Sequence, residues 1–171
     1  MTIAGLRPEA GESQVLIHEM TEDECRAALK EMDFGRLACV RGDQPYIVPV
    51  HFSYDGRHLY GITTLGQKID WMRSNPVVCL ETDERTYHDR WISIVVFGRY
   101  EELPDTPEHQ PARAHALEVL QSRTMWWEPA CVPTERRERR PPIFYRISIE
   151  QLTGRRATPD AMEVAAEESP W

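Results

Sequence analysis

The residues best suited to chemistry lie in the short segment 63–68, TTLGQK, which follows a run typical of a strand. Threonine hydroxyls, a glycine and a lysine ammonium are grouped there, and a helical pattern follows. A phosphate binds well where backbone N–H groups converge at a helix N-terminus beside a cation. We therefore take Thr63, Thr64, Gln67 and Lys68 as candidate phosphate contacts. The alternative is an ordinary strand-to-helix loop with threonine caps and a solvated lysine, which is the commoner use of such residues.

A second group of residues could form the wall of a site for a planar ring. Val48, Pro49 and Val50 lie in the strand-like run 45–54, and Arg36 opens the run 36–40. A ring needs an apolar surface on one side and hydrogen-bond donors at its carbonyls, which strand amides can supply. The same valines are equally typical of a protein core.

A third group begins the long apolar run 91–103. Ser93 needs a partner for its hydroxyl, either a ligand or a neighbouring carbonyl, and Trp91 precedes it. Farther along, Trp126 and Trp127 could line a ligand cleft or a subunit interface. The basic run 136–140 could be a solvated face, a salt-bridging flap or an anion contact.

Several classes of site lack their signatures. The histidines are scattered and no GxSxG motif occurs, so a hydrolytic triad is unsupported. No GxGxxG or GxxxxGK[ST] motif occurs either. The four cysteines form no CxxC pair beside histidines, so we predict no metal site. No residue stands out as catalytic.

The composition sets broad limits on location and partners. The chain has 171 residues and a formal net charge of −8, which disfavours binding to nucleic acids or anionic membranes. No apolar run is long enough to span a membrane, and the N-terminus does not resemble a secretory signal. The unpaired spacing of the cysteines fits a reducing cytoplasm, which is the location we expect.

The hydrophobic pattern predicts one mainly β domain. A helix is expected over 22–32, with a capping box at Thr21 and Glu24 and a stop at Gly35. Two further helices are expected over 68–74 and 112–123. The expected strands are 36–40, 45–54, 58–62, 77–84, 91–103 and 143–156, with a further short strand possible at 15–20.

The turns and ends complete this outline. Asp55-Gly56 predicts a hairpin turn, and Pro49 predicts a bulge or an edge position in its strand. We expect residues 1–14 to form a loose arm, 15–156 the domain and 157–171 an acidic tail. The element order favours a small antiparallel barrel with helices at its ends.

Four blocks of sequence in this order resemble a known superfamily. The blocks are FGRLACV, PYIVPVHFSYDGRHLYGIT, GQKIDWMRSNPVVCLETDE and WISIVVFGRYEEL. Over residues 16–155 the chain resembles the pyridoxamine 5′-phosphate oxidase-related flavin-binding split-barrel superfamily, and most of all its nitroimidazole-resistance branch. The resemblance implies a six-stranded antiparallel split β-barrel, a homodimer, and FMN held in two clefts between the subunits.

The resemblance also assigns roles to residues of this chain. The loop 63–68 would hold the phosphate, residues 48–50 would line the flavin, and residues 91–94 would come close to it. Gln67 replaces one member of a basic pair, and Ile62 stands where nitroimidazole-resistance proteins often carry a histidine. The implied cofactor-binding residues are Arg36, Val48, Pro49, Val50, Ile62, Thr63, Thr64, Gln67, Lys68, Trp91, Ser93 and Ile94.

The expected function is therefore an FMN-binding flavoprotein that acts as an oxidoreductase on a small molecule. The C-terminal signature that recognises pyridoxal phosphate is not evident, so vitamin B6 oxidation is not expected. Two alternatives stay open. One is a non-catalytic flavin-binding or sequestering protein. The other is a split barrel that binds haem, which needs an axial ligand, or a deazaflavin, which favours a more basic cleft.

Overall fold

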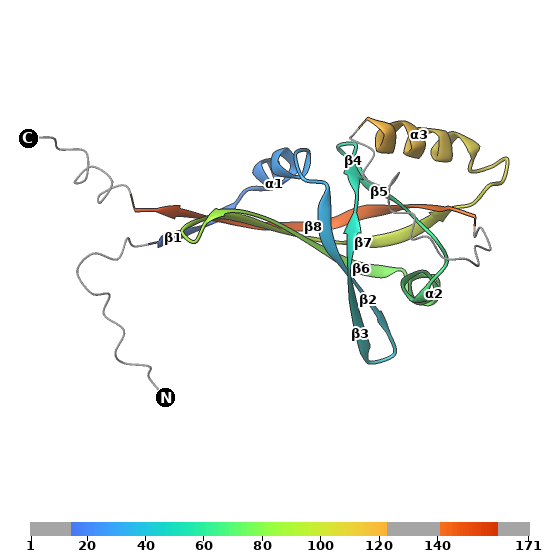
Figure 1. Cartoon of the computed structure of the whole chain (residues 1–171), viewed down its shortest axis with the longest axis horizontal. Coiled ribbons are helices and arrows are strands. Elements are labelled where there is room, and N and C mark those ends of the chain that lie inside the picture. The colour runs from blue at the N-terminus through green and yellow to red at the C-terminus, as the bar shows by residue number, and fades with distance from the viewer. Residues whose placement is uncertain (1–14, 123–140, 161–171) are drawn as a thin grey trace, which may run out of the picture.

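The computed structural model of the protein describes residues 15–122 and 141–160 (Figure 1). Residues 1–14 and 161–171, the tryptophan pair at 126–127 and the basic run 136–140 lie outside the described residues. The elements are β1 (Val15–Met20), α1 (Glu22–Leu29), β2 (Phe34–Arg41), β3 (Gln44–His51), β4 (Ser53–Tyr54), β5 (His58–Thr63), α2 (Gln67–Ser74), β6 (Val77–Tyr87), β7 (Arg90–Leu103), α3 (Gln110–Gln121) and β8 (Ile143–Pro159).

The strands of the described part form one antiparallel sheet. Its order is β3-β2-β6-β7-β8-β5-β4, and β1 pairs with β8 outside this path. The mainly β fold class is as expected, but the described residues contain eight strands and not six. One additional strand is β1, and the other arises because the expected strand 45–54 is divided into β3 and β4.

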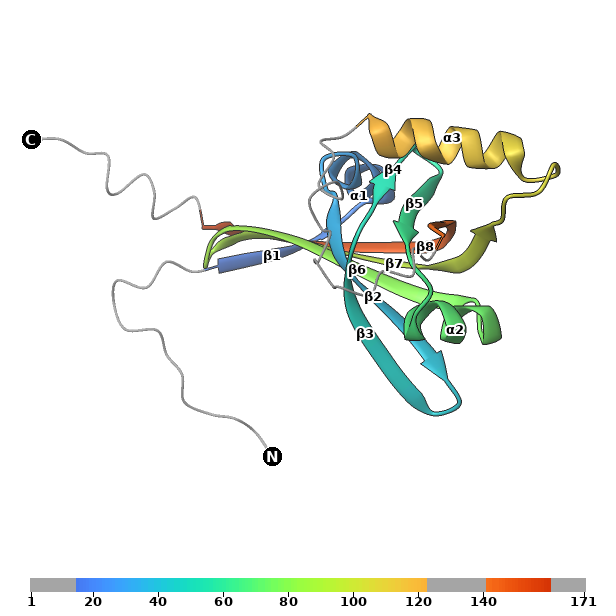
Figure 2. The same cartoon turned by 45° about the vertical axis from the view of Figure 1, so that its right-hand side comes forward.

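The division falls at Phe52, where the chain changes its pairing partner. β3 pairs with β2, whereas β4 pairs with β5. Between them, the Phe52 N–H donates to the Asp33 carbonyl at 2.9 Å, and the Phe52 ring is buried in the core. The sheet is therefore split at this point and curls around its core, as Figure 2 shows. Pro49 lies on edge strand β3, which is one of the two positions predicted for it.

The longest strand, β8, joins the two ends of the sheet. β7 pairs along most of its length, β5 pairs with its first part, and β1 pairs with its last part. β8 continues to Pro159, beyond the boundary expected at residue 156, and Ala157 is buried. β6, β7, β8 and β1 together extend as a long arm away from the helices (Figure 1).

The three expected helices are present as α1, α2 and α3, with small differences in their bounds. The capping box of Thr21 and Glu24 is present at α1, but the helix ends at Leu29, earlier than expected. We predicted that Gly35 stops this helix, and that prediction is wrong. Gly35 lies inside β2, where an added Cβ would be 2.6 Å from the backbone oxygen of Glu81 on the neighbouring strand. No helix of the described residues is long and apolar enough to cross a membrane.

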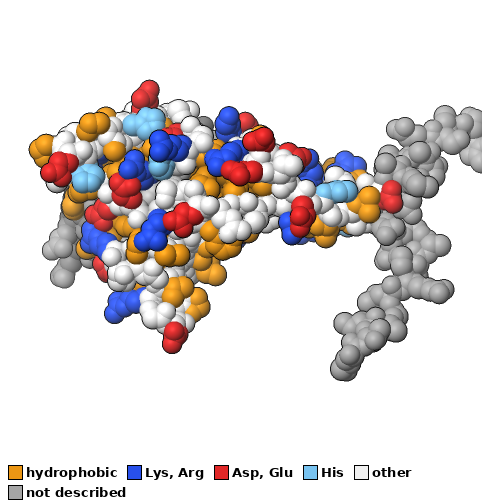
Figure 3. All heavy atoms as spheres, turned by 180° about the vertical axis from the view of Figure 1, so that it is seen from behind, with side chains coloured by type: hydrophobic (Ala, Val, Ile, Leu, Met, Phe, Trp, Pro, Cys, Tyr) orange, Lys and Arg blue, Asp and Glu red, His pale blue; other side chains and the backbone are white. Residues whose placement is uncertain are grey.

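The two faces of the sheet differ sharply over β2, β3, β6 and β7. The inward face carries fully buried side chains such as Leu37, Leu80 and Val96. The outward face carries a row of direct cross-strand partners, which we call the apolar row: Ile47, Ala38, Cys79 and Phe97. Ile47 is 64% exposed and Phe97 is 43% exposed. Figure 3 shows hydrophobic side chains gathered in the angle between the β2–β3 hairpin and the arm. An exposed apolar surface of this kind is typical of an interaction site.

Substitution of Gly98 by alanine tests the close approach of β7 and β8. An alanine Cβ at this position would collide with the backbone oxygen of Ser148, which cannot move without breaking the sheet. We expect Gly98→Ala to lower the free energy of unfolding by about 1–3 kcal/mol, measured by denaturant or thermal unfolding. Gly66→Ala is the matched control, because the nearest atom to its Cβ would be the Thr64 oxygen at 4.0 Å. Equal stability of the two variants would contradict the strand pairing described here.

Candidate functional site

The segment 63–68 forms the junction between β5 and α2. β5 ends at Thr63, and α2 begins at Gln67 after an extended Gly66 that no side chain caps. The Gly66 carbonyl accepts from the N–H groups of Ile69 and Asp70, at 3.0 and 3.2 Å. The first N–H groups of a helix have no partner within it, so this end of α2 offers donors to an anion. The structure thus places the predicted phosphate loop at a helix N-terminus.

Lys68 is the charged residue of the segment 63–68. Its side chain is half-buried, and burial lowers the pKa of its ammonium below the ordinary value. No acceptor for the Lys68 ammonium is found among residues 15–122 and 141–160. A partly desolvated cation without a partner is unfavourable. A bound phosphate would supply the missing counter-charge.

The expected wall lies on β3, beside the same helix. Val50 is buried in the core and Val48 is half-buried against it, while Pro49 is exposed. The rings of Tyr46 on β3 and Trp71 on α2 are 5.3 Å apart, so one flank of α2 lies against β3. The side chain of Val50 belongs to the core, which leaves its backbone and the neighbouring residues to face a ligand.

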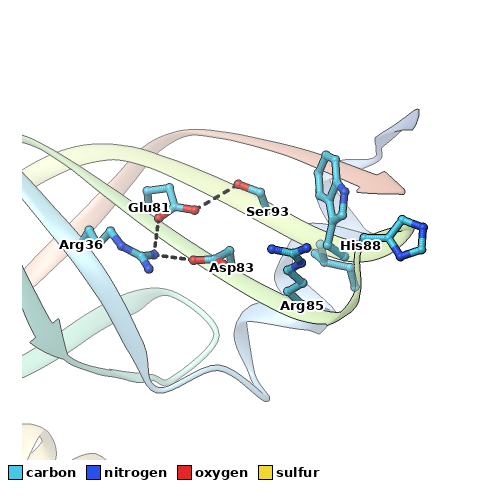
Figure 4. Close-up of a pocket in the computed structure, with 8 residues that line it drawn as sticks. Arg36, Glu81, Asp83, Arg85, His88 and Ser93 are labelled. Atoms are coloured by element: carbon cyan, nitrogen blue, oxygen red, sulfur yellow. Dashed lines mark hydrogen bonds and ion pairs between the residues drawn. The ribbon is translucent and has the colours of Figure 1, made fainter. Parts of the chain in front are cut away.

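A separate cavity of about 480 Å³ lies on the outward face of the arm (Figure 4). Arg36 from β2 forms ion pairs with Glu81 and Asp83 of β6, the first at 2.9 Å. The hydrogen bonds to Asp83 and Glu81 raise the pKa of the Arg36 guanidinium. These side chains meet because Arg36 and Glu81 are cross-strand partners, as are Asp83 and Ser93. The lining consists of Arg36, Glu81, Asp83, Arg85, His88, Trp91, Ile92 and Ser93.

The hydroxyl of Ser93 has a different partner from the carbonyl expected as the commoner choice. It donates to the second carboxylate oxygen of Glu81 at 3.1 Å. Its lone pairs therefore remain as acceptors toward the cavity. Trp91 is half-buried at the same cavity, whereas Ile94 is fully buried in the core. Ile94 can offer a ligand only its backbone.

The predicted site residues fall into two groups in one chain. Arg36, Trp91 and Ser93 share the arm cavity, and the loop residues Thr63–Lys68 lie at the start of α2. Ile62 is half-buried against the smaller apolar cluster of β5, β8 and α3. Gln67 is exposed and lines a different hollow beside Trp71. The arm cavity contains none of the loop residues 63–68 in its lining.

Sequence reasoning missed four residues that line the arm cavity, and they are Glu81, Asp83, Arg85 and His88. The alternation of charged residues along 81–85 was a signal that these side chains share one face of a strand. Their contact with Arg36 depends on the register between β2 and β6, which no local pattern reveals.

This curled antiparallel sheet, in which β3 and β4 pair with different strands, is a split barrel. Residues 21–156 match the family model described as pyridoxamine 5′-phosphate oxidase, so the chain belongs to that family. An uncharacterised protein of Rhizobium meliloti (strain 1021) is 42% identical over 146 residues, which are 84% of this chain and 97% of that protein.

Solved structures agree with this assignment. A FAD-binding protein from Mesorhizobium loti is 42% identical with a TM-score of 0.69, over 85% of this chain and 99% of that one. A putative 5-nitroimidazole antibiotic resistance protein from Bacteroides thetaiotaomicron is 17% identical with a TM-score of 0.61, over 88% and 96% of the two chains. The second likeness shows the fold alone. The predicted superfamily and split-barrel fold class are confirmed.

Proposed function

We propose that the protein is a flavin-dependent oxidoreductase that holds the FMN moiety of its cofactor at the N-terminus of α2. Lys68 carries this proposal, because its half-buried ammonium has no acceptor among residues 15–122 and 141–160 and a flavin phosphate would balance its charge. The relative from Mesorhizobium loti, which is described as FAD-binding, supports a flavin as the cofactor. The FMN moiety is common to FMN and FAD, so the same loop serves either.

The residues around Lys68 fit this cofactor. The first N–H groups of α2, which have no partner within the helix, and the hydroxyls of Thr63 and Thr64 would bind the phosphate oxygens. The exposed ring of Pro49 and the backbone of β3 would face the isoalloxazine ring. Gln67 is uncharged, so Lys68 is the cation of this segment that would bind the phosphate.

We further propose that the protein is a homodimer and that each site uses both subunits. In a two-fold dimer the same surface meets itself, which suits the uncharged apolar row of Ile47, Ala38, Cys79 and Phe97. The arm cavity with Ser93 and Trp91 lies on this same outward face. A second copy would bring its arm cavity to the flavin at the Lys68 loop of the first.

The flavin would supply the electron transfer, while the protein supplies binding and orientation. The acceptor lone pairs of Ser93, whose proton is donated to Glu81, would face an N–H group of the ring. Arg36 holds Glu81 in place for this role. Free thiols at Cys25 and Cys39, both buried, fit the cytoplasmic location that we propose.

The other cofactors fit the site less well. Haem carries no phosphate group for the segment 63–68 to bind. A deazaflavin with an acidic tail needs excess positive charge, but Arg36 is neutralised by two carboxylates. A flavin carrier without catalytic activity would use the same loop and is separated only by its reactivity.

The test is an absorbance spectrum of the protein, purified and then incubated with FMN or FAD and passed through a desalting column. We expect retained flavin bands, and reduction of the bound flavin by a nicotinamide cofactor under anaerobic conditions. A Soret band, or no retained flavin, would overturn the cofactor assignment. Retained flavin that neither a nicotinamide cofactor nor a dithionite-reduced mediator reduces, or that air does not re-oxidise afterwards, would overturn the oxidoreductase proposal.

A further inference from the structure

A second large cavity lies at the flank of α2 that carries Arg73, whereas the flank that carries Trp71 contacts β3. Its volume is about 690 Å³, which is within the usual range for small-molecule sites. Five separate segments of the chain contribute to it: the loop before α2, α2 itself, the end of β7, α3 and the start of β8. The lining consists of Leu65, Arg73, Glu102, Leu103, Pro104, Asp105, Arg113, Pro141, Pro142 and Ile143. We call it the proline cavity.

The charged groups of the proline cavity are already engaged. Arg73 forms a two-pronged ion pair with Glu102, with both contacts at 2.8 Å. Arg113 donates to the Leu103 carbonyl at 2.9 Å and stacks over the Phe144 ring, with its guanidinium carbon 4.4 Å from the ring centroid. These contacts hold the two guanidinium groups in place, and the carboxylates of Glu102 and Asp105 in the same lining balance their charge. A free anion would gain little here.

The remaining surface favours a flat, uncharged group. Pro104, Pro142 and Ile143 offer rigid apolar faces, which lose little conformational entropy when they bind an aromatic ring. At the rim, one oxygen of the Asp105 carboxylate accepts from Gln110 at 2.6 Å. The other oxygen can accept from a ligand N–H or O–H group. This combination matches an adenosine, which has a flat base and ribose hydroxyl groups.

The position of the cavity indicates what such a group would be attached to. Leu65 lines the cavity and also belongs to the phosphate loop, two residues after Thr63. Trp71 faces β3 on one flank of α2, whereas Arg73 faces the proline cavity on another. The cavity therefore lies on a different flank of α2 from the one that contacts β3.

We infer that the proline cavity binds the adenosine half of FAD, and that FAD is the cofactor of this protein in preference to FMN. This inference rests on the proposed function, because the FMN half must be held at Lys68. The pyrophosphate would cross the N-terminus of α2, and the adenine would lie against the prolines. No bond is made or broken.

Paired titrations of the apoprotein with FMN and with FAD, followed by flavin fluorescence, test the inference. We expect FAD to bind at least 10-fold more tightly than FMN. Pro142→Glu, which places a charge among the apolar faces, should weaken FAD at least 10-fold and leave FMN unchanged. Pro107→Glu is the matched control, because Pro107 is also an exposed proline but does not line the cavity. Adenosine should compete with FAD and not with FMN.

The outcomes separate the two proposals. Equal affinities for FMN and FAD, or equal weakening of both by Pro142→Glu, would overturn the adenosine site and leave the flavin proposal standing. If neither flavin binds to the wild type, both proposals are wrong. Circular dichroism of each variant shows that the fold is retained, and a second variant, Asp105→Ala, should weaken FAD alone if Pro142→Glu does not fold.

Discussion

Lys68→Ala is expected to weaken flavin binding about 10- to 100-fold while leaving the apoprotein at least as stable as the wild type. A hydrogen bond to a charged group contributes about 1.5–3 kcal/mol, and each 1.4 kcal/mol is about a factor of 10 in affinity. The gain in stability has a separate cause. The wild-type ammonium is partly desolvated and has no acceptor among the described residues, so its removal relieves a penalty. If Lys68 had only a structural role, its removal would lower the stability of the apoprotein and leave the flavin affinity unchanged.

The pH dependence of the apoprotein follows from the same burial. The pKa of Lys68 is lower in the folded protein than its ordinary value of 10.5, so the unfolded chain binds more protons between the two values. The contribution of Lys68 to the free energy of unfolding should therefore rise with pH through this alkaline window. It is measured as the difference between the wild type and Lys68→Ala, because buried groups with raised pKa values, such as Cys25, Tyr100 and Tyr145, act in the opposite direction in both proteins. Bound flavin phosphate should raise the pKa of Lys68 and thereby also remove this pH-dependent contribution to stability.

Lys30→Ala is the matched control for both measurements, because Lys30 is exposed and follows α1, far along the chain from the loop. Titration calorimetry gives the affinities, and denaturant unfolding between neutral and alkaline pH gives the stabilities. Unchanged flavin affinity in Lys68→Ala would refute the placement of the phosphate.

Phe97→Asp is expected to convert the protein from a dimer to a monomer. The apolar row places Phe97 in line with Cys79, Ala38 and Ile47, so in a two-fold dimer the new carboxylate would be buried against an uncharged surface. Burial of an unpaired charge is strongly unfavourable, and we expect the dimer dissociation constant to rise by about 100-fold or more. Sedimentation or light scattering should show a species of 19.9 kDa in place of one twice that mass.

Flavin binding should be lost together with the dimer, because each site is expected to need the arm cavity of a second copy. Leu117→Asp is the control: Leu117 is 40% exposed and Phe97 43%, but Leu117 lies on α3, away from the row. A monomeric wild type, or a dimer that persists in Phe97→Asp, would exclude the apolar row as the interface.

Much of the fold could be predicted because its signals are local. The capping box at Thr21, the hairpin turn at Gly56 and the apolar periods of α2 and α3 depend only on neighbouring residues. The division of the strand at Phe52 was missed because its cause is a hydrogen bond to Asp33, on a segment that is distant in sequence. Gly35 was misassigned for the same reason: its role is to admit the backbone of β6, which the local sequence does not reveal.

The candidate site shows the same limit. The position of residues 63–68 between a strand and a helix could be predicted because the signals are consecutive in the sequence, and the structure places them at the start of α2. The pairing of Ser93 with Glu81 and the lining of the proline cavity depend on strand register and on five separated segments, so they could not. Cys79 lies in an apolar run of the sequence, but it is only half-buried and faces outward in the apolar row, which depends on how β6 pairs with its neighbours.

The most direct test is the flavin content of the protein after reconstitution and size-exclusion chromatography. Measurement of flavin absorbance and of protein concentration across the peak gives the number of flavins per chain and the mass of the species that carries them. The proposals predict one flavin per chain, confined to the dimer. Flavin bound to a monomer, or a dimer that elutes free of flavin at saturating cofactor, would contradict them.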